Sequence, residues 1–230
     1  NEIEDEWCAE GYIPTTVVVD EKTYYTVKLG EYVAQINGGA KFETLVEAVA
    51  AAQAGDVIRL LQDVTINESI NVTNKITLNL NGKNITANFD DSYGAIYVKK
   101  GAELTITGEG DITSEGLAIG TYGTVNIEGG NITTTGSDDA ALYVFYYQDD
   151  YEGIANISGG SLNTVWNCGT LNVSGGKIDY LDTSSELNAF QFSADTGGNS
   201  LKSLSLSISE GSISFEFSLC IFRLQGANSC

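Results

Sequence analysis

A short phrase, in which apolar and polar residues alternate and then meet glycine, recurs along most of the chain. It has the form Φ-x-Φ-x-G-G-x-Φ, where Φ is apolar. Its copies begin at Leu78, Leu104, Val125, Ala155, Leu171 and Leu206. Alternation puts every second side chain of a strand on one face, so the apolar members face a core. The glycines allow a sharp turn, after which the next apolar residue returns to that core.

The phrase repeats at the period of a stacked solenoid. Its third residues are Leu80, Ile106, Ile127, Ile157, Val173 and Ile208, with a mean spacing of about 26 residues. A second apolar run follows most copies, at 95–98, 117–120, 141–144, 164–166 and 189–192. Stacked repeats bury a continuous core that no single repeat can bury. The pattern predicts an all-β, single-stranded, right-handed parallel β-helix. A β-sandwich is the alternative, but its strands would not repeat one glycine phrase.

The first part of the chain carries different signals. Residues 13–19 and 23–29 are β-rich runs around a turn at 20–22, and a strand at 32–36 ends in a second turn at 37–39. We expect residues 1–39 to form an N-terminal hairpin and connector, and residues 40–230 to form the β-helix.

One amphipathic helix is predicted over residues 44–54. Thr44 is a suitable N-cap with Glu47 three residues later, and Gly55 is a suitable C′ residue. Leu45, Ala48, Val49 and Ala52 share one face. A single helix ahead of a long β region predicts a cap over an open end of the solenoid.

The charge excludes some classes of partner. The chain has 31 acidic and 11 basic residues, a net charge of −20. Nucleic acid needs a basic surface, and an anionic membrane disfavours so acidic a chain. No stretch approaches the ~20 apolar residues of a membrane span. The first residue is Asn1 and Met is absent, so we expect a mature segment or fragment of a longer protein.

Four cysteines are widely spaced, at Cys8, Cys168, Cys220 and Cys230. This spacing does not suit zinc, and it leaves three disulfide pairings open. We expect thiols rather than disulfides, because a solenoid with a continuous core does not need cross-links.

Residues 32–66, followed by ITLNLNGKNIT and ISGG-type repeats, resemble the right-handed β-helix, pectin-lyase-like modules of large bacterial surface proteins. The resemblance covers roughly residues 8–215, and CAEGYIP at 8–14 resembles a connector between modules. It implies a helix over the N-terminal mouth of the solenoid, and export to the cell surface. It is specific for architecture and says little about activity.

Catalysis is not predicted. The chain contains no His, and its arginines, Arg59 and Arg223, flank the repeats. Acidic pairs occur at 90–91, 138–139 and 149–150, and Asp91 and Asp139 each precede a second apolar run, so they can stack on nearby turns. Such carboxylates can bind calcium or cleave a glycosidic bond. We favour solvated acidic turns, with no cofactor, and keep calcium as the alternative.

Aromatic residues supply the candidate binding site. The outward position of the second apolar run reads Tyr97, Ile119, Tyr143, Trp166 and Gln191. Exposed Tyr and Trp rows suit a glycan or a protein partner. The Tyr-rich segment 143–151 falls in a long repeat and is expected to bulge as a loop. The predicted ligand-binding residues are Tyr97, Tyr143, Tyr146, Tyr147 and Trp166. Alternatively, these rings only cover the solenoid.

Two further structural features are expected. A polar row outside the phrase strands, Asn79, Thr105, Asn126, Asn156, Asn172 and Ser207, should form a hydrogen-bonded ladder. Residues 214–224 are apolar on both faces and should pack against the last repeat or a partner.

The functional prediction is a non-catalytic structural and adhesive module of a secreted or cell-wall-anchored bacterial protein. Its partners would be glycan, a host or cell-surface protein, and neighbouring modules of the same chain. The alternative is a polysaccharide lyase or glycoside hydrolase that uses acidic residues.

Overall fold

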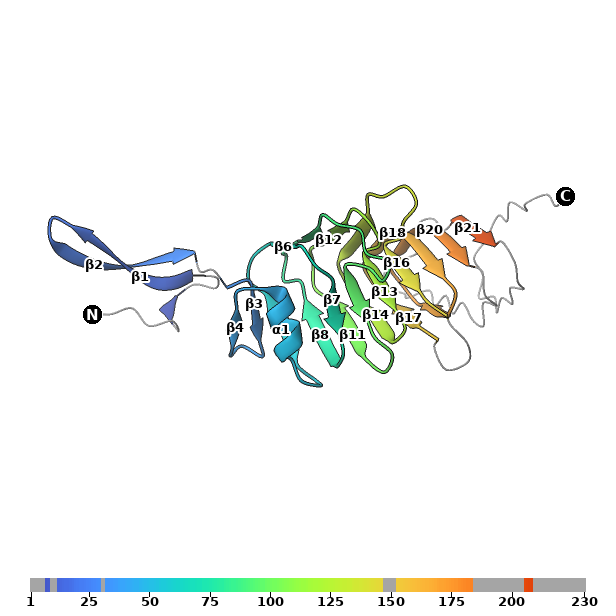
Figure 1. Ribbon diagram of the computed structural model, residues 1–230, viewed down its shortest axis with the longest axis horizontal. Coiled ribbons are helices and arrows are strands. Elements are labelled where there is room, and N and C mark those ends of the chain that lie inside the picture. Colours follow the sequence, from blue (N-terminus) through green and yellow to red (C-terminus); the bar gives the residue numbers. More distant parts are fainter. Residues whose placement is uncertain (1–6, 9–11, 30–31, 147–151, 184–204, 209–230) are drawn as a thin grey trace.

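The computed structural model describes residues 7–8, 12–29, 32–146, 152–183 and 205–208 of the chain. Within these ranges the protein is mostly β-strand with one α-helix, and most strands belong to curled parallel sheets (Figure 1). The prediction of a β-rich chain with a single helix is confirmed for this part. No helix among the described residues is long and apolar enough to cross a membrane.

An 8-stranded sheet forms one wall of the fold. Its strands are β3 (Ala34–Ile36), β4 (Lys41–Phe42), β5 (Val57–Leu60), β8 (Lys75–Asn79), β11 (Glu103–Thr107), β14 (Thr124–Ile127), β17 (Ile154–Ile157) and β19 (Thr170–Val173). From β5 to β19 every pair is parallel, whereas β3 pairs antiparallel with β4 and β5. Residues 34–36 were expected to belong to the N-terminal segment, but they form a strand of this 8-stranded sheet.

An 11-stranded sheet supplies the other walls as two columns of parallel strands. The first column contains β6 (Val64–Ile66), β9 (Ile85–Ala87), β12 (Asp111–Ser114) and β15 (Asn131–Thr134). The second column contains β7 (Ile70–Val72), β10 (Ile96–Val98), β13 (Ile119–Thr121) and β16 (Leu142–Val144). Both columns continue into β18 (Ser161–Asn167) and β20 (Lys177–Thr183), and β21 (Ser205–Ile208) extends the second.

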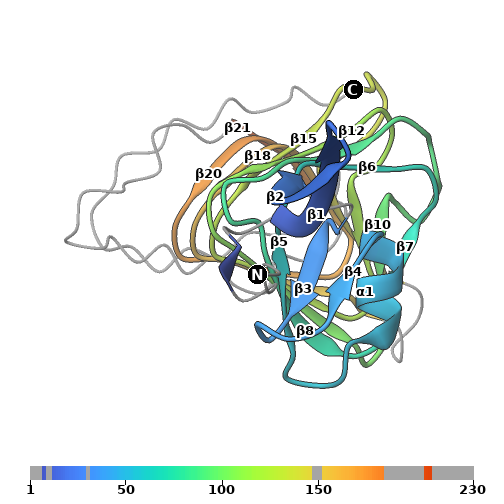
Figure 2. The ribbon, with the colours of Figure 1, turned by 90° about the vertical axis from the view of Figure 1, so that its left-hand side faces the viewer.

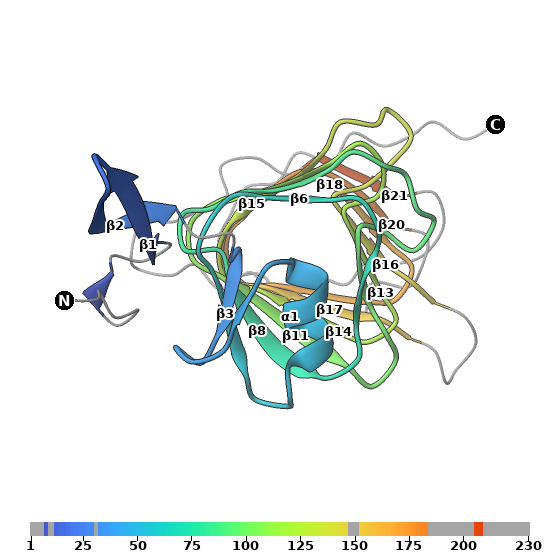
Figure 3. The same ribbon diagram turned by 60° about the vertical axis from the view of Figure 1, so that its left-hand side comes forward.

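The chain visits these walls in a fixed order. It passes through the 8-stranded sheet, then the first column, then the second, and returns to the 8-stranded sheet beside its previous strand. Strands of the same wall therefore stack in parallel around a common core (Figure 3).

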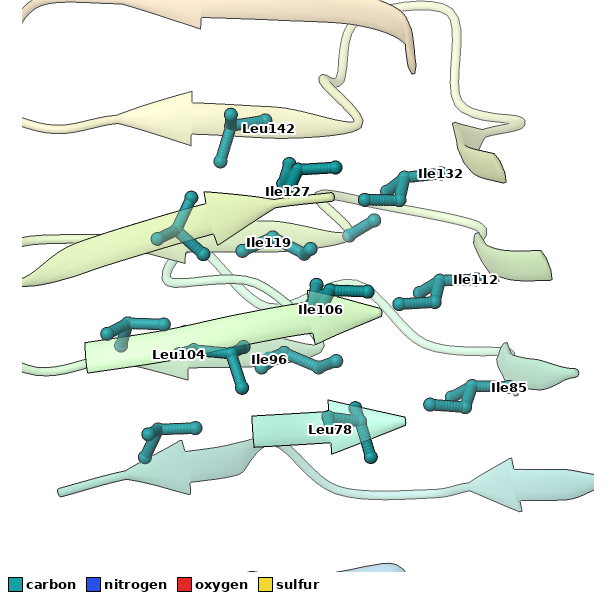
Figure 4. Close-up of a cluster of buried hydrophobic side chains, with 14 of the residues drawn as sticks. Leu78, Ile85, Ile96, Leu104, Ile106, Ile112, Ile119, Ile127, Ile132 and Leu142 are labelled. Atoms are coloured by element: carbon teal, nitrogen blue, oxygen red, sulfur yellow. The ribbon is translucent and has the colours of Figure 1, made fainter. Parts of the chain in front are cut away.

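Aliphatic side chains stack inside the walls in register. Leu78, Ile106 and Ile127 form one such line, and Ile96, Ile119 and Leu142 form another (Figure 4). These side chains are at most 2% exposed. Full burial of each aliphatic side chain contributes ~1.5–3 kcal/mol, so the lines are the main stabilising element.

The observed register corrects two sequence alignments. Leu78, rather than Leu80, lies beside Ile106, because the turn after β8 is longer than the turn after β11. Ile208 pairs with Thr183 in the second column, not with Val173 in the 8-stranded sheet.

We call one passage of the chain through the three walls a circuit. The 16 residues between Ile157 and Val173 complete one circuit, because these two residues pair in neighbouring strands. A circuit normally needs a loop between the two columns. Here the single seven-residue strand β18 pairs with β15 at its start and with β16 at its end, so no loop is needed.

Helix α1 (Leu45–Ala51) lies at the end of the molecule nearest the N-terminal hairpin (Figure 2). Thr44 Oγ1 accepts a hydrogen bond from Glu47 N at 3.1 Å, which confirms the predicted N-cap. Leu45, Ala48 and Val49 join the main core. The helix ends three residues earlier than predicted, with Ala52 as C-cap, and the amide of Gly55 instead donates to the carbonyl of Lys75.

The predicted hairpin consists of β1 (Tyr12–Val19) and β2 (Lys22–Leu29). Asp20 and Glu21 have φ values of 49° and 60°, as a two-residue type I′ loop requires, so Lys22 begins the second strand instead of completing the turn. The hairpin projects beyond the end of the curled sheets (Figure 1).

An amide ladder runs along the outside of the 8-stranded sheet, largely as predicted. Asn126 donates to Thr105 Oγ1 at 3.1 Å, Asn156 donates to Asn126 Oδ1 at 2.8 Å, and Asn172 donates to Asn156 Oδ1 at 2.9 Å. Two predicted members are absent. Thr77 occupies the row instead of Asn79, and Ser207 lies in the second column.

Replacing Asn156 with Ala should lower the free energy of unfolding by ~1–3 kcal/mol, because Asn156 is both donor and acceptor in the ladder. Asn172→Ala is the control, since this exposed residue at the end of the ladder donates to Asn156 and removes that one bond. Urea unfolding measures both. Equal effects of the two substitutions would contradict a cooperative ladder.

Candidate functional site

The outer face of the second column brings three of the predicted site residues together. Parallel pairing aligns Tyr97 with Gly120, Gly120 with Tyr143, and Tyr143 with Trp166. All three aromatic side chains are partly buried on this face. Aromatic residues from circuits far apart in sequence therefore form one row.

Ile119 does not belong to this row, contrary to the prediction. It pairs with Ile96 and is fully buried in the core, which leaves Gly120 at the outward position. The sequence pattern aligns the run at 117–120 with the run at 95–98 one residue out of register. Because side chains alternate along a strand, this shift exchanges inside and outside. Gln191, the last predicted member, lies outside the described residues.

Gly120 makes room for an aromatic residue that the sequence pattern did not reveal. A Cβ built on Gly120 would lie 2.6 Å from Cε2 of Phe145 and would also collide with the carbonyl oxygen of Tyr93. The ring of Phe145 thus folds back over the gap left by the glycine. Phe145 is only 9% exposed, although it leaves the end of β16.

Six rings make contact and form what we call the aromatic cluster: Tyr93, Tyr97, Tyr122, Tyr143, Phe145 and Trp166. The ring centroids of Tyr143 and Phe145 are 4.3 Å apart, and those of Tyr122 and Phe145 are 4.8 Å apart. Tyr93 lies 4.9 Å from Tyr97, and Tyr143 lies 5.6 Å from Trp166. Each such pair adds ~0.5–1.5 kcal/mol beyond the area it buries.

One side of the aromatic cluster packs against buried residues, and the other side is partly exposed to solvent. Leu117 and Ala140 are buried with Phe145, and Tyr122, Tyr143 and Trp166 pack against them. Tyr93 is 50% exposed at one border. The cluster therefore presents a rigid, partly exposed apolar surface.

Of the other two predicted tyrosines, Tyr146 directly follows Phe145 of the cluster in the chain. Tyr146 is 48% exposed and forms an isolated antiparallel bridge with Glu152. Tyr147 lies outside the described residues. Three cluster members, Tyr93, Tyr122 and Phe145, were not predicted. Phe145 lies within the Tyr-rich segment at 143–151, and its contact with Gly120 of another circuit left no local signal in the sequence.

Cys168 lies against the aromatic cluster. Its Sγ is 3.6 Å from Oη of Tyr143. Burial, then the hydrogen bond with Cys168, then the charges of Cys168 and Tyr122 raise the pKa of Tyr143 to about 12. Neither Cys8 nor Cys168 forms a disulfide with another described residue, and Cys220 and Cys230 lie outside the described ranges.

An acidic corner borders the aromatic cluster, where three successive loops join the first column to the second. It contains Asp90, Asp91, Glu115, Asp138 and Asp139. Burial raises the pKa of Asp139, and the charges of Asp90 and Asp138 raise it further. Asp90, rather than Asp91, is thus the neighbour that acts on Asp139. Asp91 instead accepts a hydrogen bond from the amide of Tyr93 at 2.8 Å.

The described residues contain no group of three or more His, Cys, Asp or Glu side chains arranged to hold a metal ion. A separate open pocket of about 530 Å³ lies between the start of α1 and β6. Its lining combines apolar residues with Glu43, Glu47, Asp63 and Glu68. Among the described residues, this pocket and the acidic corner each bring several carboxylates together.

The comparisons with known proteins add no relative. No protein-family model, curated protein or solved structure matches the chain. The geometry of the described residues therefore carries the functional argument.

Replacing Gly120 with Ala should lower the free energy of unfolding by ~1–3 kcal/mol, because the methyl group displaces Phe145 or the carbonyl of Tyr93. Near-ultraviolet circular dichroism should weaken as the rings separate. Gly39→Ala is the control, since its Cβ would be 3.5 Å from the nearest atom, an ordinary contact. An unchanged aromatic signal in Gly120→Ala would show that Phe145 is not seated over this glycine.

Tyr143 should ionise at about pH 12, above its ordinary value of 10.0. In the unfolded chain this tyrosine ionises at its ordinary pKa, which is lower than its pKa in the folded protein. The stabilisation that protonated Tyr143 gives the folded state is therefore fully present below pH 10 and is lost as the pH rises from 10 through 12. The tyrosinate absorbance of the protein minus that of Tyr143→Phe measures this pKa. Cys168→Ala should lower it, and a difference titration centred at pH 10 would contradict the packing.

Proposed function

We propose that the protein is a non-catalytic structural and adhesive module of a secreted or cell-wall-anchored bacterial surface protein. In this proposal the parallel circuits form a right-handed β-helix. Support comes from the return of the chain to each wall in the same order, since connections between parallel strands are right-handed in ~98% of cases. The pectin-lyase-like resemblance of residues 8–215 points the same way.

The observation that carries the proposal is the aromatic cluster. Tyr97, Tyr143 and Trp166 come from three circuits, yet the strand register holds them in one row on a continuous core. Core stability alone does not need Tyr and Trp on an outer face. A rigid, partly exposed aromatic surface lowers the entropic cost of binding and is typical of recognition sites.

The partner is a molecule at the cell surface: a glycan or a protein. The net charge of −20 disfavours nucleic acid and anionic membranes. The hairpin of β1 and β2 is suited to contact a neighbouring module of the same polypeptide, since its exposed side chains include Val18 at 67% and Tyr24 at 53%.

A polysaccharide-active enzyme is the second candidate, and one observation favours it. Asp139 has a raised pKa beside Asp90 and Asp138, an environment in which a carboxyl group can keep its proton and act as an acid. Hydrolysis requires two carboxyl groups on opposite sides of a glycosidic bond. Release of reducing ends or unsaturated sugars from a polysaccharide panel would favour this candidate.

The test of the binding function compares the protein with the variant Tyr97→Ala/Trp166→Ala. Fluorescent beads coated with each protein are incubated with epithelial cells and with a glycan array. The double variant should lose at least ~10-fold in apparent affinity, because truncating aromatic anchors commonly costs 2 kcal/mol or more.

Tyr24→Ala is the matched control, since Tyr24 is an exposed tyrosine on the hairpin. Its binding should equal that of the original protein. Equal binding by the double variant, with its circular dichroism intact, would remove the aromatic cluster as the binding surface.

A further inference from the structure

We propose that the aromatic cluster docks a basic segment of a partner protein, whose Lys and Arg side chains lie over its rings and pair with the acidic corner beside it. This inference rests on the proposed binding function and names the partner class of the same surface.

The acidic corner is built into the fold. Backbone hydrogen bonds stack its loops: Thr135 donates to Ser114, and Glu115 donates to Ala87. Glycines create space for the carboxylates, since a Cβ on Gly116 would lie 2.5 Å from Oδ1 of Asp90, and one on Gly136 would collide with Oδ2 of Asp139. The negative charges are therefore held in a row that runs from one circuit to the next.

The acidic corner directly borders the aromatic cluster. The amide of Tyr93 is bound by the Asp91 carboxylate at 2.8 Å, and the Tyr93 ring contacts Tyr97. On another circuit, Asp139 precedes Ala140, which is buried with Phe145. At the far end of the row, the register places Asp182 beside Trp166. Carboxylates thus lie on two sides of the rings.

In the part of the chain that the structure describes, two ion pairs, Lys75 with Glu103 and Lys177 with Asp179, lie away from this corner. The effect of Asp90 and Asp138 on Asp139 shows that like charges remain close together. A bound cation would relieve this repulsion.

The chemistry favours a cationic segment over a glycan. Arg and Lys can pair with carboxylates while lying on Tyr or Trp rings, so they use both features of the surface. A neutral glycan would use the rings alone, and an anionic glycan would be repelled. The net charge of −20 also attracts a basic partner at long range.

The probe is a fluorescein-labelled peptide of alternating Arg and Ser, with an alternating Gln and Ser peptide as the neutral match. Fluorescence anisotropy at low ionic strength should show binding of the Arg peptide alone. Asp90→Asn/Asp139→Asn should weaken it at least ~10-fold, as loss of complementary charge at an interface commonly does. These substitutions relieve repulsion, so they should not unfold the protein.

The control variant Asp20→Asn/Glu21→Gln removes the same charge from the hairpin, far along the chain from the corner. It should bind the Arg peptide as the original protein does. Equal weakening in both variants would overturn the inference, because attraction would then reflect net charge alone.

A second arm separates this inference from the function on which it depends. The protein is also tested with a neutral oligosaccharide such as cellohexaose. If it binds the oligosaccharide but not the Arg peptide, the proposal of a cationic partner is wrong. If Tyr97→Ala/Trp166→Ala then abolishes oligosaccharide binding, the aromatic cluster is still the binding surface. If Tyr97→Ala/Trp166→Ala leaves peptide binding unchanged, docking on the aromatic cluster is wrong.

Discussion

In-register stacking of inward aliphatic side chains is the constraint on which the rest of this structure depends. Ile96, Ile119 and Leu142 lie one above another because three circuits repeat the same position of a parallel strand. A slip of one residue would move these side chains to the outer face and lose ~1.5–3 kcal/mol for each. The loops can differ in length as long as this register returns, which explains how a 16-residue circuit and a 30-residue circuit can adjoin.

The same register decides what the outer faces can do. On the 8-stranded sheet it aligns Asn126, Asn156 and Asn172, and their amides bond from circuit to circuit. On the second column it aligns Tyr97, Gly120, Tyr143 and Trp166, so the glycine leaves a gap that Phe145 fills. One face is thereby a stabilising polar ladder and the other a rigid aromatic surface. The acidic corner adds a charge that neither the core nor the ladder requires.

The repeat pattern predicted most of the inward positions, and the capping-box pattern predicted the N-cap at Thr44, because both follow from local spacing and backbone hydrogen bonding. The repeat pattern placed Tyr97, Tyr143 and Trp166 on one face correctly, since each follows a buried apolar residue of its own strand. It misplaced Ile119 because Ala118 and Gly120 also fit an alternating run, and only long-range pairing with Ile96 decides between them. The position of Phe145 depends on a contact with another circuit, which local pattern does not contain.

The most direct test of the stacking register is disulfide trapping between circuits. Thr113 and Thr133 lie beside each other on the outer face of the first column, with their hydroxyl oxygens 3.2 Å apart, whereas Thr134 faces inward. With the four native cysteines changed to Ser, Thr113→Cys/Thr133→Cys should form an intramolecular disulfide on mild oxidation, as read by intact mass and thiol alkylation. Thr113→Cys/Thr134→Cys should remain reduced. A disulfide in the second variant and none in the first would contradict the register and everything built on it.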